Sequence, residues 1–223
     1  MLVPQDSQNP KGKEESPVSV QYAEAPPPAY EQPQVIAPPT IKAANYISVI
    51  RRLGEIKETF VLDPTLQLPL HMKPSNDKLH LNISALLGEV DADVYVVGTG
   101  TPQSGKTRIR VSSTLGTTKL VLRAPHSQSR APMAVSVRAH LGEVNLLLPR
   151  SFRGPLRMSA ALGDVTLSKG LRAASTKFGD NQMFVGEWSQ AETGEAVWSG
   201  DEAHVESTMG TVYVGYDDET KKS

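Results

Sequence analysis

The chain of 223 residues contains no cysteine, and aromatic residues make up only 5% of it. The lack of cysteine excludes disulfides, thiolate zinc sites and cysteine nucleophiles, and it is typical of a reducing compartment. No apolar run approaches the roughly 18–20 residues that a transmembrane helix needs. The N-terminal stretch Met1–Asp6 has neither the basic nor the apolar region of a signal peptide. These absences predict a cytoplasmic protein that does not associate with a membrane.

The chain also lacks an excess of charge of either sign. Lys and Arg number 23 and Asp and Glu number 24, which gives a formal net charge of -1. Proteins that bind nucleic acid normally carry a basic excess, because they neutralise phosphates. We therefore expect no nucleic-acid partner.

The first 40 residues differ in composition from the rest. They hold 9 of the 17 prolines, and their few apolar residues follow no helix or strand period. Such a segment cannot bury enough apolar surface to offset roughly 1–2 kcal/mol per residue of backbone ordering. We expect residues 1–40 to be a disordered Pro-rich tail with polyproline II character around Pro26–Pro28. Residues 41–217 are long enough for one well-buried domain, and 218–223 form a charged C-terminal tail.

An internal repeat organises the domain. In each copy a Leu or Met precedes a glycine, a small residue lies three positions before the glycine, and mostly apolar residues lie at alternate positions on both sides. The five glycines are Gly88, Gly116, Gly142, Gly163 and Gly210. Alternation with a period of two predicts two half-buried strands, joined at a bend where glycine adopts a positive φ. We expect the glycine and its polar successor to point outward, and the apolar residue before the glycine to face the core.

Two all-β folds fit this repeat. In a single-stranded β-solenoid, which we favour, each copy is one rung, the glycine is a corner, and the small residues stack. In an antiparallel β-sandwich, the glycine would begin a type II′ hairpin turn. Successive glycines are 28, 26, 21 and then 47 residues apart, so the last interval could hold a degenerate rung at Gly186. An earlier irregular copy surrounds Gly54, with Arg51 and Glu58 at positions that are otherwise small or apolar.

The tail carries one short binding motif, the PPxY sequence of Pro27, Pro28 and Tyr30. WW domains bind such peptides because the polyproline II conformation is already formed and little entropy is lost on docking. The prolines would occupy an aromatic groove, and Tyr30 would fill a second pocket. The motif predicts a WW-domain partner, such as a ubiquitin ligase, against the alternative of a plain solvated linker.

Residues 100–107 match the phosphate-binding pattern GxxxxGK[ST] letter by letter. That chemistry requires a helix after the loop, whose N-terminal N–H groups bind the phosphates. Residues 107–113 instead alternate like a strand and belong to a repeat copy. We therefore predict a loop between two strands and no nucleotide site.

Carboxylates and histidines do not form an evident reaction centre. Asp91 and Asp93 share one strand face, but the next copy has Lys119 and Val121 at the equivalent positions, so neither a calcium site nor an acid/base pair is expected. We expect the histidines to be surface residues rather than metal ligands. They are His71, His80, His126, His140 and His204.

Several short segments support a resemblance to known families. They are Asn45–Ile47, Phe60–Pro64, Leu148–Gly154, Phe184–Trp188 and Tyr213–Glu219. With its glycine-paced strands, the chain resembles bacterial adhesin-like β-solenoid families and, more closely, a family of fungal, mostly basidiomycete, proteins that share a domain of unknown function. The resemblance covers roughly residues 41–219 and implies an intracellular fungal setting. It implies no activity, ligand or catalytic residue.

Together these features predict a non-enzymatic intracellular scaffold or interaction protein without a cofactor or metal. The tail would recruit a WW-domain protein, and exposed end strands could pair into homo-oligomers. The alternative is a carbohydrate-binding or carbohydrate-processing β-helix protein.

Overall fold

The computed structural model describes residues 39–67, 79–98, 105–124, 130–187 and 198–219. All of them belong to the compact unit Val35–Ser223. The predicted tail, residues 1–40, lies outside the described residues except for its last two.

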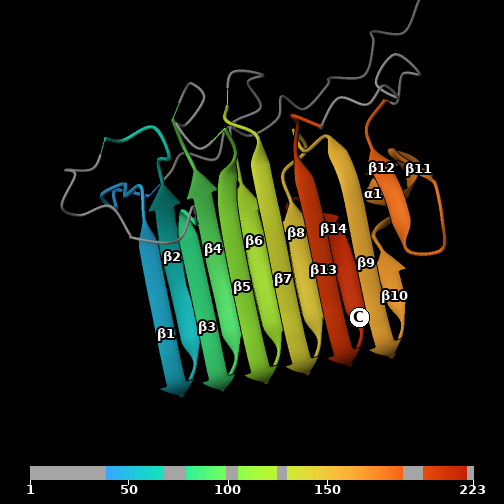
Figure 1. The fold of residues 1–223 in the computed structure, drawn as a ribbon, viewed down its shortest axis with the longest axis horizontal. Helices are drawn as coiled ribbons and strands as arrows, with labels where there is room; N and C mark the ends of the chain where they lie inside the picture. The colour runs from blue at the N-terminus through green and yellow to red at the C-terminus, as the bar shows by residue number, and fades with distance from the viewer. Residues whose placement is uncertain (1–38, 68–78, 99–104, 125–129, 188–197, 220–223) are drawn as a thin grey trace, which may run out of the picture. The chain divides into compact units, whose positions relative to one another are not determined.

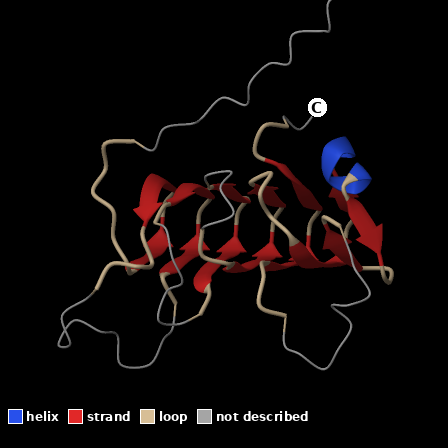
Figure 2. Ribbon diagram, turned by 90° about the horizontal axis from the view of Figure 1, so that it is seen from above, coloured by secondary structure: helices blue, strands red, loops and turns tan. Residues whose placement is uncertain are grey.

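The described residues form mostly strands, which assemble into an eight-stranded and a six-stranded open sheet. The two sheets form two facing layers, and a core of Val, Leu, Ile and Ala fills the space between them (Figure 2). Across the larger sheet (Figure 1) the order is β1 (Ile47–Leu53), β3 (Leu81–Leu87), β5 (Thr107–Leu115), β7 (Met133–Leu141), β13 (Glu202–Met209), β9 (Gly154–Leu162), β12 (Gln182–Val185) and β11 (Ser175–Lys177). Across the smaller sheet it is β10 (Val165–Leu167), β14 (Val212–Tyr216), β8 (Val144–Leu148), β6 (Thr118–Arg123), β4 (Val90–Val96) and β2 (Ile56–Leu62).

Each copy of the repeat contributes one strand to each sheet, and equivalent residues of neighbouring copies lie opposite one another. Ala85 of β3 pairs with Ser113 of β5, which pairs with Ala139 of β7, all in parallel. The predicted strands on both sides of the glycine and the stacking of the small residues are confirmed. The antiparallel sandwich is wrong for these copies, because the two strands that flank a glycine lie in different sheets and form no hairpin.

The glycine at the bend is required by its neighbour as well as by its own backbone. Gly142 has a φ of +146°, and a Cβ placed on it would lie within 3.0 Å of the carbonyl oxygen of Gly116. The same close approach links each glycine of the repeat to that of the adjacent copy. Serine at the small position supports this stack, because Ser207 Oγ donates a hydrogen bond to the carbonyl of Gly142 at 3.0 Å. The bends of neighbouring copies therefore approach each other so closely that only glycine, which has no Cβ, fits at this position.

The last copy of the repeat does not lie at the end of the sheets. β13 lies between β7 and β9, and β14 lies between β8 and β10. The predicted degenerate rung at Gly186 is wrong, since this residue follows β12, which runs antiparallel along the outer side of β9. The interval of 47 residues instead contains helix α1 (Lys169–Ala173), β11 and β12.

The two edges of the larger sheet are irregular. At β1, Arg51 and Glu58 form an ion pair at 2.5 Å, which explains two charges at positions that are small or apolar in the other copies. At the other edge, Ser168 caps α1 by accepting a hydrogen bond from the Leu171 N–H. Glu219, placed by the sequence in a solvated tail, accepts a hydrogen bond from the Gly170 N–H at 3.0 Å.

Candidate functional site

The residues of the PPxY motif, Pro27, Pro28 and Tyr30, lie outside the described residues. So do residues 100–104 of the phosphate-loop pattern. The end of that pattern is described, and Thr107 is the fully buried first residue of β5. The chain continues as a strand, as predicted, so the helix that phosphate-loop chemistry requires is replaced by β5.

The histidines of the described part do not gather. His140 is exposed, and its Nδ1 lies 3.2 Å from the hydroxyl of Thr208. The prediction that His80 is a surface residue is wrong: it is 8% exposed, and its Nδ1 accepts a hydrogen bond from the Arg108 N–H at 3.0 Å. Burial and the nearby Arg108 charge lower the pKa of His80. Among the described residues, no group of three or more His, Asp or Glu side chains could hold a metal ion.

The paired aspartates of β4 are neutralised by the next copy. Asp91 lies 3.2 Å from Lys119, and Asp93 accepts a hydrogen bond from Arg123 at 2.9 Å. The register places Asp91 opposite Lys119 and Asp93 opposite Val121, as the repeat predicts. Both carboxylates therefore belong to cross-strand ion pairs on the outer face of the smaller sheet.

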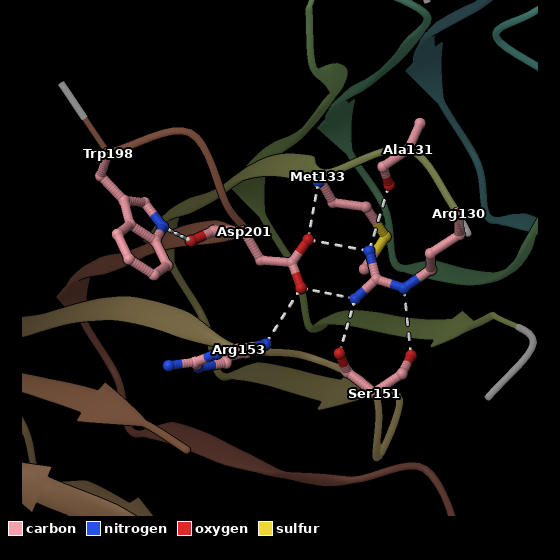
Figure 3. Close-up of polar contacts among 7 residues, drawn as sticks. All are labelled: Arg130, Ala131, Met133, Ser151, Arg153, Trp198 and Asp201. Atoms are coloured by element: carbon pink, nitrogen blue, oxygen red, sulfur yellow. Dashed lines mark hydrogen bonds and ion pairs between the residues drawn. The ribbon is translucent and has the colours of Figure 1, made fainter. Parts of the chain in front are cut away.

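A buried ion pair holds three strands together where they begin (Figure 3). Arg130 and Asp201 contact each other at 2.5 and 2.8 Å, with side chains 7% and 5% exposed. Asp201 also accepts hydrogen bonds from the N–H groups of Met133, at the start of β7, and of Arg153, just before β9. Arg130 in turn donates to the hydroxyl and the carbonyl of Ser151. We refer to these five residues as the clasp.

The clasp explains why the last copy lies where it does. Asp201 directly precedes β13, and its carboxylate reaches the strands on both sides, β7 and β9. Trp198 reinforces this position, because its Nε1 donates to the Asp201 carbonyl at 2.7 Å and its ring packs edge-on against Phe184. Both carboxylate oxygens of Asp201 thus accept hydrogen bonds that hold strands together, so the clasp is structural rather than reactive.

Five of the six residues that precede the glycines of the repeat are exposed and the sixth, Leu141, is half-buried, so the prediction that they face the core is wrong. Leu53 is 73% exposed, Leu87 40%, and Leu162 64%. In the order of the strands, the row runs Leu53, Leu87, Leu115, Leu141, Met209 and Leu162, each opposite the next. We refer to this row as the leucine ladder. It follows the end of the larger sheet at the bend between the two layers.

An acidic row accompanies the leucine ladder. The residue after each glycine is acidic in four copies of the repeat and threonine in the other two. The acidic members are Glu55, Glu89, Glu143 and Asp164, and all are exposed. The other flank of the ladder is mixed and includes Arg52, Leu86 and His140. The apolar ladder is therefore bordered on one side by carboxylates in four of the six copies.

Comparison with known proteins places this architecture in a family. Residues 45–219 match the model of the domain of unknown function DUF7330. The chain belongs to this family. The DUF7330 match confirms the expected family of unknown function over nearly the expected range, whereas a fungal origin stays a prediction. The sequence has no significant match among curated proteins.

One solved structure is similar to the DUF7330 chain in fold. It is a candidate cell adhesion protein from Clostridium sporogenes ATCC 15579, solved at 1.95 Å, with a TM-score of 0.47 and 12% sequence identity. The match covers 78% of this chain and 93% of the bacterial chain.

Sequence reasoning missed both the clasp and the exposure of the ladder. Arg130 and Asp201 are 71 positions apart and belong to no motif, so nothing in the sequence links them. The ladder residues recur with the repeat, but a leucine at a recurring position gives the same sequence pattern whether its side chain faces the core or solvent.

Of the described helices of the DUF7330 domain, none has the length and apolar character to cross a membrane.

Proposed function

We propose that the protein is a non-enzymatic intracellular interaction protein, in which a short β-solenoid presents the leucine ladder to a partner. The observation that supports this proposal is the exposure of the ladder, since Leu53, Leu162 and Met209 are 73%, 64% and 48% exposed. Apolar side chains gathered in a row on a surface typically mark an interaction site. The repeat makes the ladder continuous, because each residue lies opposite its equivalent in the next copy.

The length and energy of the ladder suit a helical segment. Six neighbouring strands at a spacing of about 4.8 Å make it about 24 Å long, which an α-helix of about 16 residues matches at 1.5 Å per residue. Burying the exposed half of one leucine contributes about 1 kcal/mol. The ladder as a whole could therefore support binding in the micromolar range after the cost of association.

The acidic row specifies the chemistry of the partner. Glu55, Glu89, Glu143 and Asp164 lie beside the ladder, so a helix with one apolar face and Lys or Arg along its border would meet opposite charges. A second copy of this chain is less suited, because its own ladder carries the same carboxylates. We therefore commit to a basic amphipathic helix as the occupant.

The N-terminal tail would provide a second, independent contact. The PPxY residues Pro27, Pro28 and Tyr30 would bind a WW domain in the cytoplasm, while the β-domain holds its own partner. Two contacts on one chain would hold their two partners at a high effective concentration relative to each other. The chain would thereby act as an adaptor between a WW-domain protein, such as a ubiquitin ligase, and the ladder's partner.

A titration with a designed helical peptide of Leu and Lys tests the ladder. We expect the methyl NMR signals of Leu87, Leu115 and Met209 to shift, and replacing Leu115 and Met209 by serine to weaken binding about 10-fold or more. The matched control is Ile50→Ser, which removes an apolar side chain that is 69% exposed on the outer face of β1 but not in the ladder.

Three results would overturn the ladder proposal. The first is an equal loss of affinity in the Ile50→Ser variant, and the second is equal binding of a peptide with Glu in place of Lys. The third is a dimer in sedimentation that the serine variants dissociate, since the occupant would then be a second copy.

The tail contact has its own test. A WW domain should bind the full chain in the micromolar range, and Tyr30→Ala should abolish binding whereas Tyr22→Ala, in the same tail but outside the motif, should not. Equal binding by the Tyr30→Ala chain would refute the WW contact and leave the ladder unaffected.

A further inference from the structure

Three arginines line a hollow on the outer face of the larger sheet. The hollow has a volume of about 450 Å³ and lies over β5, β7, β13 and β9. Arg108 and Arg110 come from β5, and Arg157 comes from β9. Because β7 and β13 lie between these two strands, the arginines border the hollow from both sides.

The register aligns two of the arginines in one row across the sheet. Arg110 lies opposite Ser136 of β7, and Ser136 lies opposite His204 of β13. Arg157 is on the other side of His204. Three strand spacings of about 4.8 Å place the backbones of the two arginines about 14 Å apart. Both long side chains can therefore lean over the same central position, above a hydroxyl and an imidazole.

The three arginines of the hollow form no side-chain hydrogen bond or ion pair with another described residue. Most other arginines of the described part have a side-chain partner. On the same face of the sheet, for example, Arg138 lies 3.4 Å from Glu206. Cations that remain unpaired side by side repel one another, and an anion between them would remove that repulsion.

The one carboxylate among the residues that line the hollow, that of Glu202, already has an ion-pair partner. Glu202 lies 3.2 Å from Lys106, so it does not neutralise the arginines. The floor of the hollow lies below the surrounding arginines because β7 contributes the small residues Ala134 and Ser136. The hollow is therefore positive in charge, open to solvent, and lined by groups that can donate hydrogen bonds.

The clasp keeps the hollow in shape. Asp201 immediately precedes Glu202 and ties together the starts of β7, β13 and β9, three of the four strands that form the hollow. Because these buried hydrogen bonds fix the strands, ligand binding would have to order only the side chains of the site.

We propose that this hollow binds the phosphate group of a small phosphate monoester, held by Arg110 and Arg157 above Ser136 and His204, with Arg108 contributing charge. Guanidinium groups match phosphate oxygens with paired N–H donors, and a dianion suits several arginines better than a carboxylate does. The volume lies within the range of small-molecule pockets. This site is separate from the leucine ladder and from the PPxY motif, and its test is independent of theirs.

The experiment is an NMR titration of the full chain, observing the arginine Nε–Hε signals with phenyl phosphate, inorganic phosphate and benzoate as probes. We expect saturable shifts for Arg108, Arg110 and Arg157 and none for Arg138. Phenyl phosphate should bind at least about 10-fold more tightly than benzoate, because hydrogen bonds to a dianion from several guanidinium groups are stronger.

Substitutions of single arginines test whether phenyl phosphate binds in the hollow. Arg110→Gln and Arg157→Gln should each weaken phenyl phosphate binding about 10-fold, and Arg138→Gln, the matched control, by less than about two-fold. All three residues are exposed, so these variants should keep the amide spectrum of the folded chain. The proposal fails if no probe saturates, if benzoate binds as well as phenyl phosphate, or if Arg138→Gln has the same effect. Tighter binding of a single-stranded oligonucleotide than of phenyl phosphate would also overturn it.

Discussion

Replacing Asp201 by asparagine tests whether the clasp determines the stability of the domain. The carboxylate of Asp201 accepts hydrogen bonds from Arg130 and from the N–H groups of Met133 and Arg153. Asparagine has nearly the same shape but offers one acceptor oxygen and no charge. Its amide group would face N–H donors where a carboxylate oxygen now accepts their hydrogen bonds.

The size of the expected loss in stability follows from the burial of the ion pair between Arg130 and Asp201. The side chains of Arg130 and Asp201 are 7% and 5% exposed, so solvent cannot replace the lost partner. Removing one member of a buried ion pair costs about 3–5 kcal/mol. We therefore expect a loss of about 4 kcal/mol in the free energy of unfolding, which is a large part of the roughly 5–15 kcal/mol typical of a whole domain.

Urea unfolding followed by tryptophan fluorescence and by circular dichroism measures this loss. Trp198 donates a hydrogen bond to the Asp201 backbone and should report on the opening of the clasp. The control is Glu206→Gln, which breaks the exposed ion pair with Arg138 on the same sheet and should cost less than about 1 kcal/mol. Equal losses for the two variants would refute the reasoning.

A double variant separates charge from shape. Combining Asp201→Asn with Arg130→Met removes the buried charge that the single variant leaves uncompensated. We expect the double variant to be about 1–3 kcal/mol more stable than the sum of the two single effects predicts. Strict additivity would mean that the two side chains do not act as a pair.

Two further predictions concern the repeat and the buried histidine. Gly142→Ala should destabilise the domain by about 2 kcal/mol or more, because its Cβ would collide with the Gly116 carbonyl, whereas Gly179→Ala has nothing within 4 Å and should be nearly neutral in thermal unfolding. An equal effect at both glycines would argue against the stacked bends. Burial and Arg108 lower the pKa of His80 from its usual 6.5, so the unfolded chain takes up its proton first and stability falls as the pH drops below 6.5. His80→Asn should show a smaller fall in urea midpoint between pH 7 and pH 5, and an unchanged fall would show that other groups are responsible.

Much of the strand framework can be predicted from the sequence because alternation and glycine spacing are local properties. The register follows too, since equivalent positions such as Asp91 and Lys119 come to lie side by side. The candidate sites could not be predicted in this way. The hollow requires knowing that β13 brings His204 between Ser136 and Arg157, residues that are far apart in the chain.

The sequence by itself, without cysteine and with few aromatics, determined a repeat of paired strands with glycine at each bend, because only glycine tolerates that backbone and a small residue must lie beside it. Only the tertiary structure decided where the last copy lies and which leucines stay in solvent. The order of strands depends on contacts such as that of Asp201 with β7 and β9, which form between residues distant in sequence. The exposure of Leu87 and Leu162 depends on the path of the bend, since the repeat pattern is the same for an inward and an outward leucine.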